Sequence, residues 1–253
     1  MNLLRKSLTF IIVIMFFWGG CQSQPPAKAD ITGQSPQLFE KEIVKHLKAG
    51  YLLYLPDSYY GDTDKFWPVI LFLHGAGERG DDLELVKVEG LPKNLETTKD
   101  FPFIVISPQC PAEAEGWPVE ILKELVSDLT KKYRIDRDRM YLTGLSMGGR
   151  GTWSMAVEYP GMFAAIAPIC GRVTDRRLER LKNTPVWVFH GALDKTVPVE
   201  NSREAVDALT KMGAEVKFTV YPEAGHDSWT ETYNNPELYD WFLQHKRKTG
   251  NKW

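Results

Sequence analysis

The chain has 253 residues, of which 43% are hydrophobic and 25% are charged, and its formal net charge is −2. This composition is typical of an ordinary globular protein with one sizeable core, so it predicts a single folded domain rather than several. The 31 Lys and Arg residues are interspersed among 33 Asp and Glu residues. Such a balance argues against nucleic acid as a partner.

The N-terminus has the pattern of an export signal. Arg5 and Lys6 precede an apolar run at residues 8–18 that is too short for a stable membrane span. We therefore expect residues 1–20 to be a signal peptide. Small residues come directly before Cys21, as in the lipobox of bacterial lipoproteins. We expect an exported protein, in the periplasm or at the cell surface, that contacts the membrane only through a lipid on Cys21.

A later cleavage site is the alternative to lipidation. Trp18 stands where a lipobox usually has an aliphatic residue, and Ala27-Lys28-Ala29 offers an A-x-A site for an ordinary signal peptidase. Residues 21–36 are rich in Gln, Pro, Ser and Ala, which is typical of a flexible tether. Residues 37–253 are then expected to form the folded domain.

Short runs rich in β-branched and aromatic residues alternate along this domain with segments of helical spacing. The runs predict buried strands at residues 51–55, 69–73, 103–107, 140–143, 164–169, 186–189 and 216–221. The spacing predicts helices at residues 119–133, 152–159, 203–212 and 236–246. The alternation predicts an α/β fold with a mostly parallel central sheet and helices on both faces. Site residues should then follow the carboxyl ends of strands.

A Gly-x-Ser-x-Gly motif at residues 144–148 lies between the strand predicted at 140–143 and the helix predicted at 152–159. This is the context of a nucleophile elbow, in which a serine occupies a strained turn at the end of a strand. The flanking glycines leave room for the adjoining backbone. Ser146 is therefore the candidate nucleophile.

A serine hydroxyl needs a base within hydrogen-bond reach and an acid that orients the base. In a chain with such an elbow, the order is serine, acid, histidine. His226 is the candidate base because it lies in a loop just past the strand predicted at 216–221. Asp194, four residues beyond the tip of the strand predicted at 186–189, is the candidate acid. Rival acids in more charged or helix-adjacent stretches are Asp175, Glu179 and Glu200.

The negative charge that forms on a substrate carbonyl needs two backbone N–H donors. The residue after the nucleophile, Met147, supplies one, and the loop after the strand predicted at 69–73 should supply the other. Ala76 in that loop is the candidate, with Gly77 as the alternative. For His74 in the same loop, we expect hydrogen bonds that brace the loop rather than a direct catalytic role.

These motifs resemble the α/β-hydrolase superfamily. Within it, they are similar to exported esterases related to polyhydroxybutyrate depolymerases and to feruloyl or acetylxylan esterases, a group also described as predicted peptidases or phospholipase/carboxylesterases. The matching segments are residues 71–80, 107–111, 144–149, 191–198 and 225–229. The resemblance implies an α/β-hydrolase fold in which the strand at 69–73 lies between those at 103–107 and 140–143, with the strand at 164–169 beyond.

The implied strand order bears on Cys110 and Cys170, which in an exported protein are candidates for a disulfide. They would follow strands three positions apart, about 14 Å, which exceeds the Cα separation that a disulfide allows. We therefore expect two free thiols.

The expected activity is that of a serine carboxylic ester hydrolase acting through an acyl-enzyme, without a metal or another cofactor. The resemblance suggests small-molecule or oligosaccharide esters, such as the feruloyl or acetyl groups of plant polysaccharides. Trp117 and Trp229, in loops near the expected site, and Gln109 are candidate substrate contacts. We expect a monomer.

Two alternative functions are consistent with the same motifs. One is a serine peptidase related to prolyl oligopeptidases, although those peptidases usually carry an additional domain that restricts access. The other is a non-catalytic surface binding protein on a hydrolase scaffold, against which the complete set of Ser146, Asp194 and His226 argues.

Overall fold

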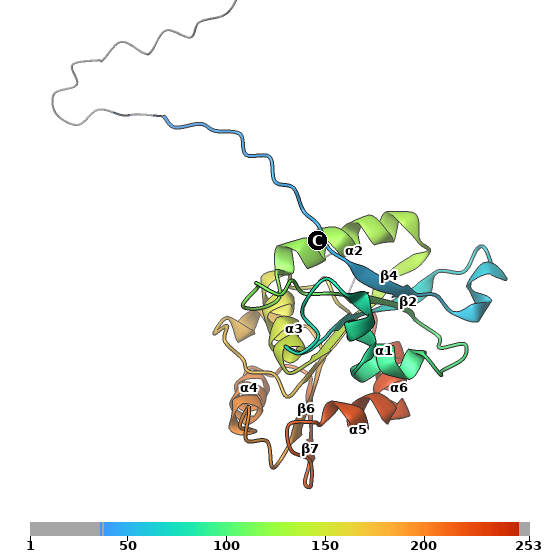
Figure 1. Cartoon of the computed structure of the whole chain (residues 1–253). Coiled ribbons are helices and arrows are strands. Elements are labelled where there is room, and N and C mark those ends of the chain that lie inside the picture. Colours follow the sequence, from blue (N-terminus) through green and yellow to red (C-terminus); the bar gives the residue numbers. More distant parts are fainter. Residues whose placement is uncertain (1–35, 37, 248–253) are drawn as a thin grey trace, which may run out of the picture. The chain divides into compact units, whose positions relative to one another are not determined.

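The computed structural model describes residue 36 and residues 38–247 (Figure 1). The expected signal peptide, Cys21 and nearly all of the expected tether lie outside these residues. Residues 1–45 and 46–253 form two separate units. The described part of the first unit contains no helix or strand. Within the described part of the chain, no helix is long and apolar enough to cross a membrane.

The second unit is built on a seven-stranded sheet with the order β1-β3-β2-β4-β5-β6-β7. The strands are β1 (Tyr51–Tyr54), β2 (Trp67–Leu73), β3 (Ile104–Pro108), β4 (Ile135–Leu145), β5 (Ala165–Ile169), β6 (Val186–Gly191) and β7 (Val216–Tyr221). Only β1 pairs with its neighbour in antiparallel orientation; all other neighbouring strands are parallel. The mostly parallel sheet and the predicted order of its central strands are therefore confirmed.

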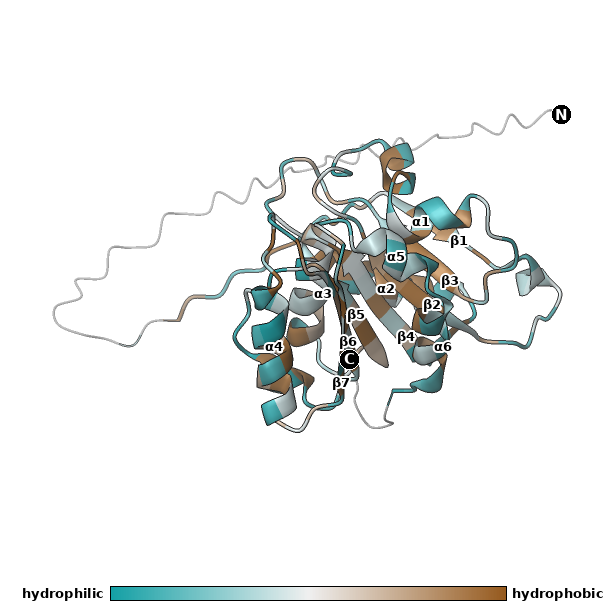
Figure 2. Ribbon diagram, turned by 90° about the horizontal axis from the view of Figure 1, so that it is seen from below, coloured by the Kyte–Doolittle hydropathy of each residue, from teal (hydrophilic) through white to brown (hydrophobic). Residues whose placement is uncertain are grey.

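Helices cover both faces of the sheet (Figure 2). The helices are α1 (Gly90–Leu95), α2 (Val119–Lys132), α3 (Met147–Glu158), α4 (Glu200–Lys211), α5 (Trp229–Asn234) and α6 (Pro236–Gln244). Side chains of α2, α3 and α4 belong to one buried cluster, and those of α1, α5 and α6 belong to a second. Along β2, Val69 and Leu71 face the first cluster while Ile70 and Phe72 face the second, as the two-residue period of a strand requires. The two clusters fix the sheet between its helical layers.

Four elements differ from the sequence prediction. β4 begins at Ile135, five residues before the predicted start, because its first half is polar and lacks the apolar pattern used to find strands. α3 begins at Met147, directly after Ser146, although three glycines in its first turns hide its helical spacing. α1 and α5 have six residues each, too few to show a helical period.

Candidate active site

Ser146 occupies a strained turn between β4 and α3. Its backbone angles are φ 53° and ψ −111°, a combination that residues other than glycine rarely adopt. The turn is held because the Ser146 N–H donates to the carbonyl of Ile169 at 2.9 Å. A Cβ atom at Gly144 would lie 2.6 Å from the carbonyl oxygen of Leu73, and one at Gly148 would clash with the same oxygen. This is the geometry of a nucleophile elbow.

The structure brings Ser146, His226 and Asp194 into one hydrogen-bonded chain. His226 Nε2 lies 2.8 Å from Ser146 Oγ, and His226 Nδ1 lies 2.7 Å from Asp194 Oδ2. An ionised carboxylate only accepts hydrogen bonds, so Nδ1 carries the proton and Nε2 is left to accept the hydroxyl proton of Ser146. The three residues follow β4, β7 and β6, at the carboxyl ends of parallel strands.

Asp194 is held as a carboxylate by the groups around it. Its side chain is fully buried, and burial by itself would raise its pKa. Hydrogen bonds from His226 and from the backbone N–H groups of Val197 and Thr196 outweigh that effect, so the pKa of Asp194 lies below its ordinary value. The acid is therefore ionised throughout the neutral range.

The loops that carry the acid and the base are joined by main-chain hydrogen bonds. The Ala192 N–H donates to the carbonyl of Tyr221, and the Leu193 N–H donates to the carbonyl of Ala224, both at 2.9 Å. These bonds continue the pairing of β6 with β7 past the ends of the strands. The separation of Asp194 from His226 is thus set by backbone as well as by side chains.

The two predicted oxyanion donors lie beside Ser146. Met147 is the first residue of α3, Ala76 lies in the loop after β2, and both line a hollow that includes Ser146. His74 Nδ1 donates to the carbonyl of Gly75 at 2.6 Å, and His74 Nε2 accepts from the Cys110 N–H at 3.0 Å. The buried imidazole therefore braces this loop.

The hollow beside Ser146 has a volume of about 340 Å³ and a cationic lining. Three of its lining residues are basic, Arg79, Arg150 and Arg172, and one is acidic, the exposed Glu115. Arg79 donates to the carbonyls of Ala76 and Ala114, and Arg150 donates to the carbonyl of Glu115. Among the described residues, no carboxylate forms an ion pair with any of the three. A larger cavity of about 760 Å³ lies at the opposite, amino ends of β5, β6 and β7, away from Ser146.

None of these three arginines was predicted as a site residue. Arg79 lies within the loop that was chosen for its glycines, and Arg150 lies one helical turn after Ser146. Their positions relative to the two motifs are the signal that would have found them. Arg172 follows the end of β5 without any motif of its own.

Two of the predicted substrate contacts are corrected. Gln109 is only 5% exposed, and its amide donates to the carbonyls of Glu78 and Asp82 at 2.9 and 2.8 Å. Trp117 is 8% exposed, and its Nε1 donates to the carbonyl of His74. Both side chains use their polar groups to hold loops in place, so neither offers a free donor to a substrate.

The third predicted contact, Trp229, lies next to the base. Its ring meets the His226 imidazole edge-on at 5.4 Å between centroids, and its Nε1 lies 3.2 Å from Glu89 Oε2. The indole is half-buried and so helps to fix the position of His226.

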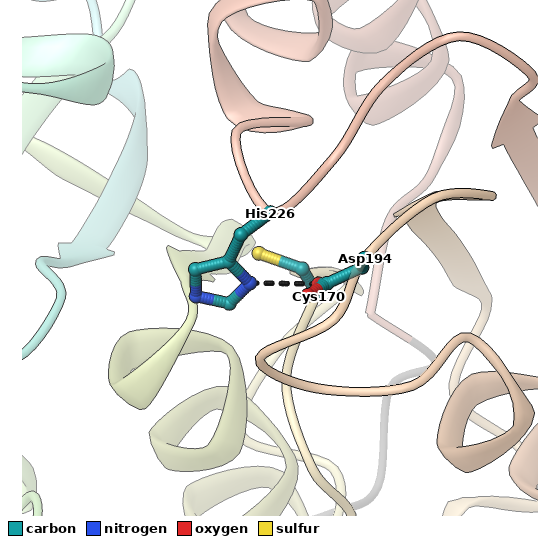
Figure 3. A group of neighbouring side chains, drawn as sticks. All are labelled: Cys170, Asp194 and His226. Atoms are coloured by element: carbon teal, nitrogen blue, oxygen red, sulfur yellow. Dashed lines mark hydrogen bonds and ion pairs between the residues drawn. The ribbon is translucent and has the colours of Figure 1, made fainter.

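Cys110 and Cys170 are both buried and free, as predicted. Cys170 Sγ lies beside the pair formed by Asp194 and His226, and ligand atoms of the three fall within 4.8 Å of one another (Figure 3). A metal ion bound there would have to replace the proton between His226 and Asp194. Burial raises the pKa of the Cys170 thiol to about 12, which favours a neutral packing group over a metal-binding thiolate.

The sheet order, the elbow after β4 and the sequence of serine, acid and histidine define the class: the chain has the α/β-hydrolase fold. Residues 29–240 match the model of the dienelactone hydrolase family, and the chain belongs to this family.

Individual relatives agree with this assignment. The chain is 26% identical over 188 residues to a probable carboxylesterase SOBER1-like of Arabidopsis thaliana, a match covering 62% of this chain and 71% of that protein. It is 29% identical over 140 residues to a protein of Salmonella typhimurium named "Putative carboxymethylenebutenolidase", a match covering 46% of this chain and half of the relative.

A solved structure extends the likeness to three dimensions. The crystal structure of a thermostable esterase is 36% identical, with a TM-score of 0.67, and the match covers 78% of this chain and 59% of that one. The chain thus matches only part of the length of these proteins.

Proposed function

We propose that the chain is a serine carboxylesterase that hydrolyses esters through an acyl-enzyme on Ser146. The observation that carries this proposal is the hydrogen-bonded chain from Ser146 through His226 to Asp194, with distances of 2.8 and 2.7 Å. Membership of a hydrolase family and the likeness to esterases support it.

In this mechanism, Ser146 Oγ attacks the ester carbonyl while His226 Nε2 takes the hydroxyl proton. The backbone N–H groups of Met147 and Ala76 stabilise the oxyanion. His226 then returns the proton to the leaving alcohol, and water repeats the two steps on the acyl-enzyme. Asp194 stays ionised throughout and stabilises the imidazolium that forms between the transfers.

Two substrate classes are in question. The resemblance to feruloyl and acetylxylan esterases supports acyl groups on plant polysaccharides. The arginine-lined hollow favours a second class, esters or lactones whose acyl part carries an anion. The hollow is lined by Ser146 and Met147 but not by His226, and the leaving alcohol must lie next to His226 to be protonated. A group in the hollow therefore belongs to the acyl side of the ester.

The activity is tested with matched assays on p-nitrophenyl acetate, methyl ferulate, acetylated oligosaccharides and short peptide amides. We expect ester turnover, labelling by a serine-reactive fluorophosphonate, and loss of both in Ser146→Ala. Faster cleavage of amides than of esters would favour the peptidase instead. Unchanged ester turnover in Ser146→Ala, or no labelling of the wild type, would favour a binding role or a different site.

We also propose that the protein is an exported, monomeric lipoprotein in which the N-terminal segment carries the anchor and residues 37–253 carry the activity. The support is the charged and apolar pattern before Cys21. In a bacterial host, labelling with radioactive palmitate should depend on Cys21, and Cys21→Ser should abolish it. Labelling that survives this substitution would contradict the proposal.

A further inference from the structure

We infer that His190, a second histidine, is a positioning residue that holds the catalytic acid; this inference rests on the proposed function. His190 lies near the end of β6, four residues before Asp194, and is fully buried. Its Nε2 lies 3.2 Å from Asp194 Oδ2, the same oxygen that binds His226 Nδ1. The acid therefore lies between two imidazoles.

The contacts of His190 determine where its proton is. Nε2 lies 2.8 Å from the carbonyl oxygen of Val197 and 3.2 Å from Asp194 Oδ2. Both oxygens can only accept, so Nε2 must carry a hydrogen. The shorter contact is the hydrogen bond to Val197, and the positive end of the same N–H group is close to the carboxylate.

The same contacts close a small ring around the acid. The Val197 N–H donates to Asp194 Oδ1 at 2.9 Å, while the Val197 carbonyl accepts from His190. His190 therefore holds the turn that supplies hydrogen bonds to one carboxylate oxygen and places its own N–H near the other. Rotation of the Asp194 side chain would weaken contacts on both oxygens.

His190 also joins the acid to a helix. Its Nδ1 lies 2.7 Å from the hydroxyl of Ser202, a fully buried residue in the first turn of α4. In the tautomer that carries its hydrogen on Nε2, Nδ1 accepts the hydrogen bond from the Ser202 hydroxyl. The chain of polar contacts thus runs from α4 through His190 and Asp194 to His226 and Ser146.

The test compares His190→Leu, which removes the donor, with His190→Gln, which keeps an amide N–H on a side chain of similar length. His245→Gln is the control, since His245 also makes two hydrogen bonds but lies at the amino ends of the strands. On p-nitrophenyl acetate, we expect kcat to fall about tenfold in His190→Leu with KM nearly unchanged. His190→Gln should recover most of the rate, and the control should match the wild type.

Two readouts separate positioning from mere support of the fold. Without the His190 N–H, the Asp194 carboxylate is less stabilised and attracts the protonated imidazole of His226 more strongly. The acid limb of the kcat/KM profile should therefore move to higher pH by about half a unit. The low-field proton NMR resonance of the N–H between His226 and Asp194 should also shift in His190→Leu and return in His190→Gln. The NMR readout needs no substrate, so it stands even if the wild type hydrolyses no ester.

If His190→Leu does not fold, Ser202→Ala replaces it, since this variant keeps His190 and removes only its Nδ1 partner. In Ser202→Ala, we expect the loss of kcat, the shift of the acid limb and the shift of the NMR resonance to be about a third as large as in His190→Leu. If neither the acid limb of the pH profile nor the NMR resonance shifts in the folded variant, the inference is overturned. No ester turnover by the wild type, with the resonance behaving as expected, would overturn the proposed function alone.

Discussion

The triad and the hollow beside it differ in how their side chains are held. Ser146, His226 and Asp194 bind one another through short side-chain contacts, and the acid is additionally held by backbone N–H groups. In the hollow, the partners of Arg79 and Arg150 among the described residues are carbonyl oxygens, and Arg172 is exposed. The triad is thus held rigidly, while the arginines of the hollow retain donors that no described residue uses. Specificity can therefore change without disturbing the reaction machinery.

The largest effect should come from removing the base. His226→Ala leaves Ser146 without a proton acceptor, and we expect kcat on p-nitrophenyl acetate to fall about 10⁴- to 10⁶-fold. His245→Ala is the matched control and should retain wild-type kcat. A loss of less than a hundredfold in His226→Ala would show that another group activates Ser146.

Asp194→Asn should cost somewhat less, about 10³- to 10⁴-fold in kcat, because the amide can donate to His226 Nδ1 and favour the wrong tautomer.

The same variant also tests the lowered pKa of Asp194. A lowered pKa in the folded state stabilises the protein above the unfolded pKa of about 4 and ceases to do so as pH falls through the folded value. The difference in melting temperature between the wild type and Asp194→Asn should therefore shrink below pH 4; a constant difference would contradict the shift.

The hollow should respond more modestly and selectively. In Arg172→Gln, we expect the ratio of kcat/KM for monomethyl glutarate to that for methyl valerate to fall about tenfold, because one charged donor is lost. Arg176→Gln removes an exposed arginine four residues away that does not line the hollow. An equal change in both variants would show that the effect arises from overall charge.

The smallest effect is expected at the two buried thiols. Burial raises the pKa of both Cys110 and Cys170, in the second case to about 12, so both remain protonated at pH 8. The folded protein should keep its activity in the presence of a thiol reagent, and denaturant should expose two thiols that are absent from a Cys110→Ser/Cys170→Ser variant. Stability should decrease as pH rises above about 9, where the unfolded thiols ionise first. Rapid inactivation of the folded protein at pH 8 would refute this.

The parts of the molecule that the sequence predicted are those that leave a local pattern. The apolar strand runs revealed the sheet, and the motifs around Ser146, Asp194 and His226 follow strands whose ends meet at one edge. The polar half of β4 was missed because its place depends on pairing with β2 rather than on its own composition. The helices α1 and α5 were missed because six residues are too few to show a helical period.

The environment of the site was harder to predict than its chemistry. Gln109 and Trp117 were expected to contact a substrate, but both side chains are buried, and neighbouring carbonyl groups accept hydrogen bonds from them. Whether a polar side chain in a loop turns inward depends on carbonyls supplied by distant segments, which no local pattern reveals. Of the arginines in the hollow, Arg172 has no motif of its own, whereas Arg79 and Arg150 lie at fixed positions relative to motifs that the sequence shows.

The backbone bonds between the loops of Asp194 and His226 have a consequence for protein engineering. Because Ala192 and Leu193 donate to Tyr221 and Ala224, the two loops are fastened together in register. Exchanging either loop with that of a related enzyme would leave its partner with mismatched backbone donors and acceptors. Exchanged as a pair, the loops would bring their own alignment of acid and base, so we expect joint exchange to preserve the site better than exchange of one loop.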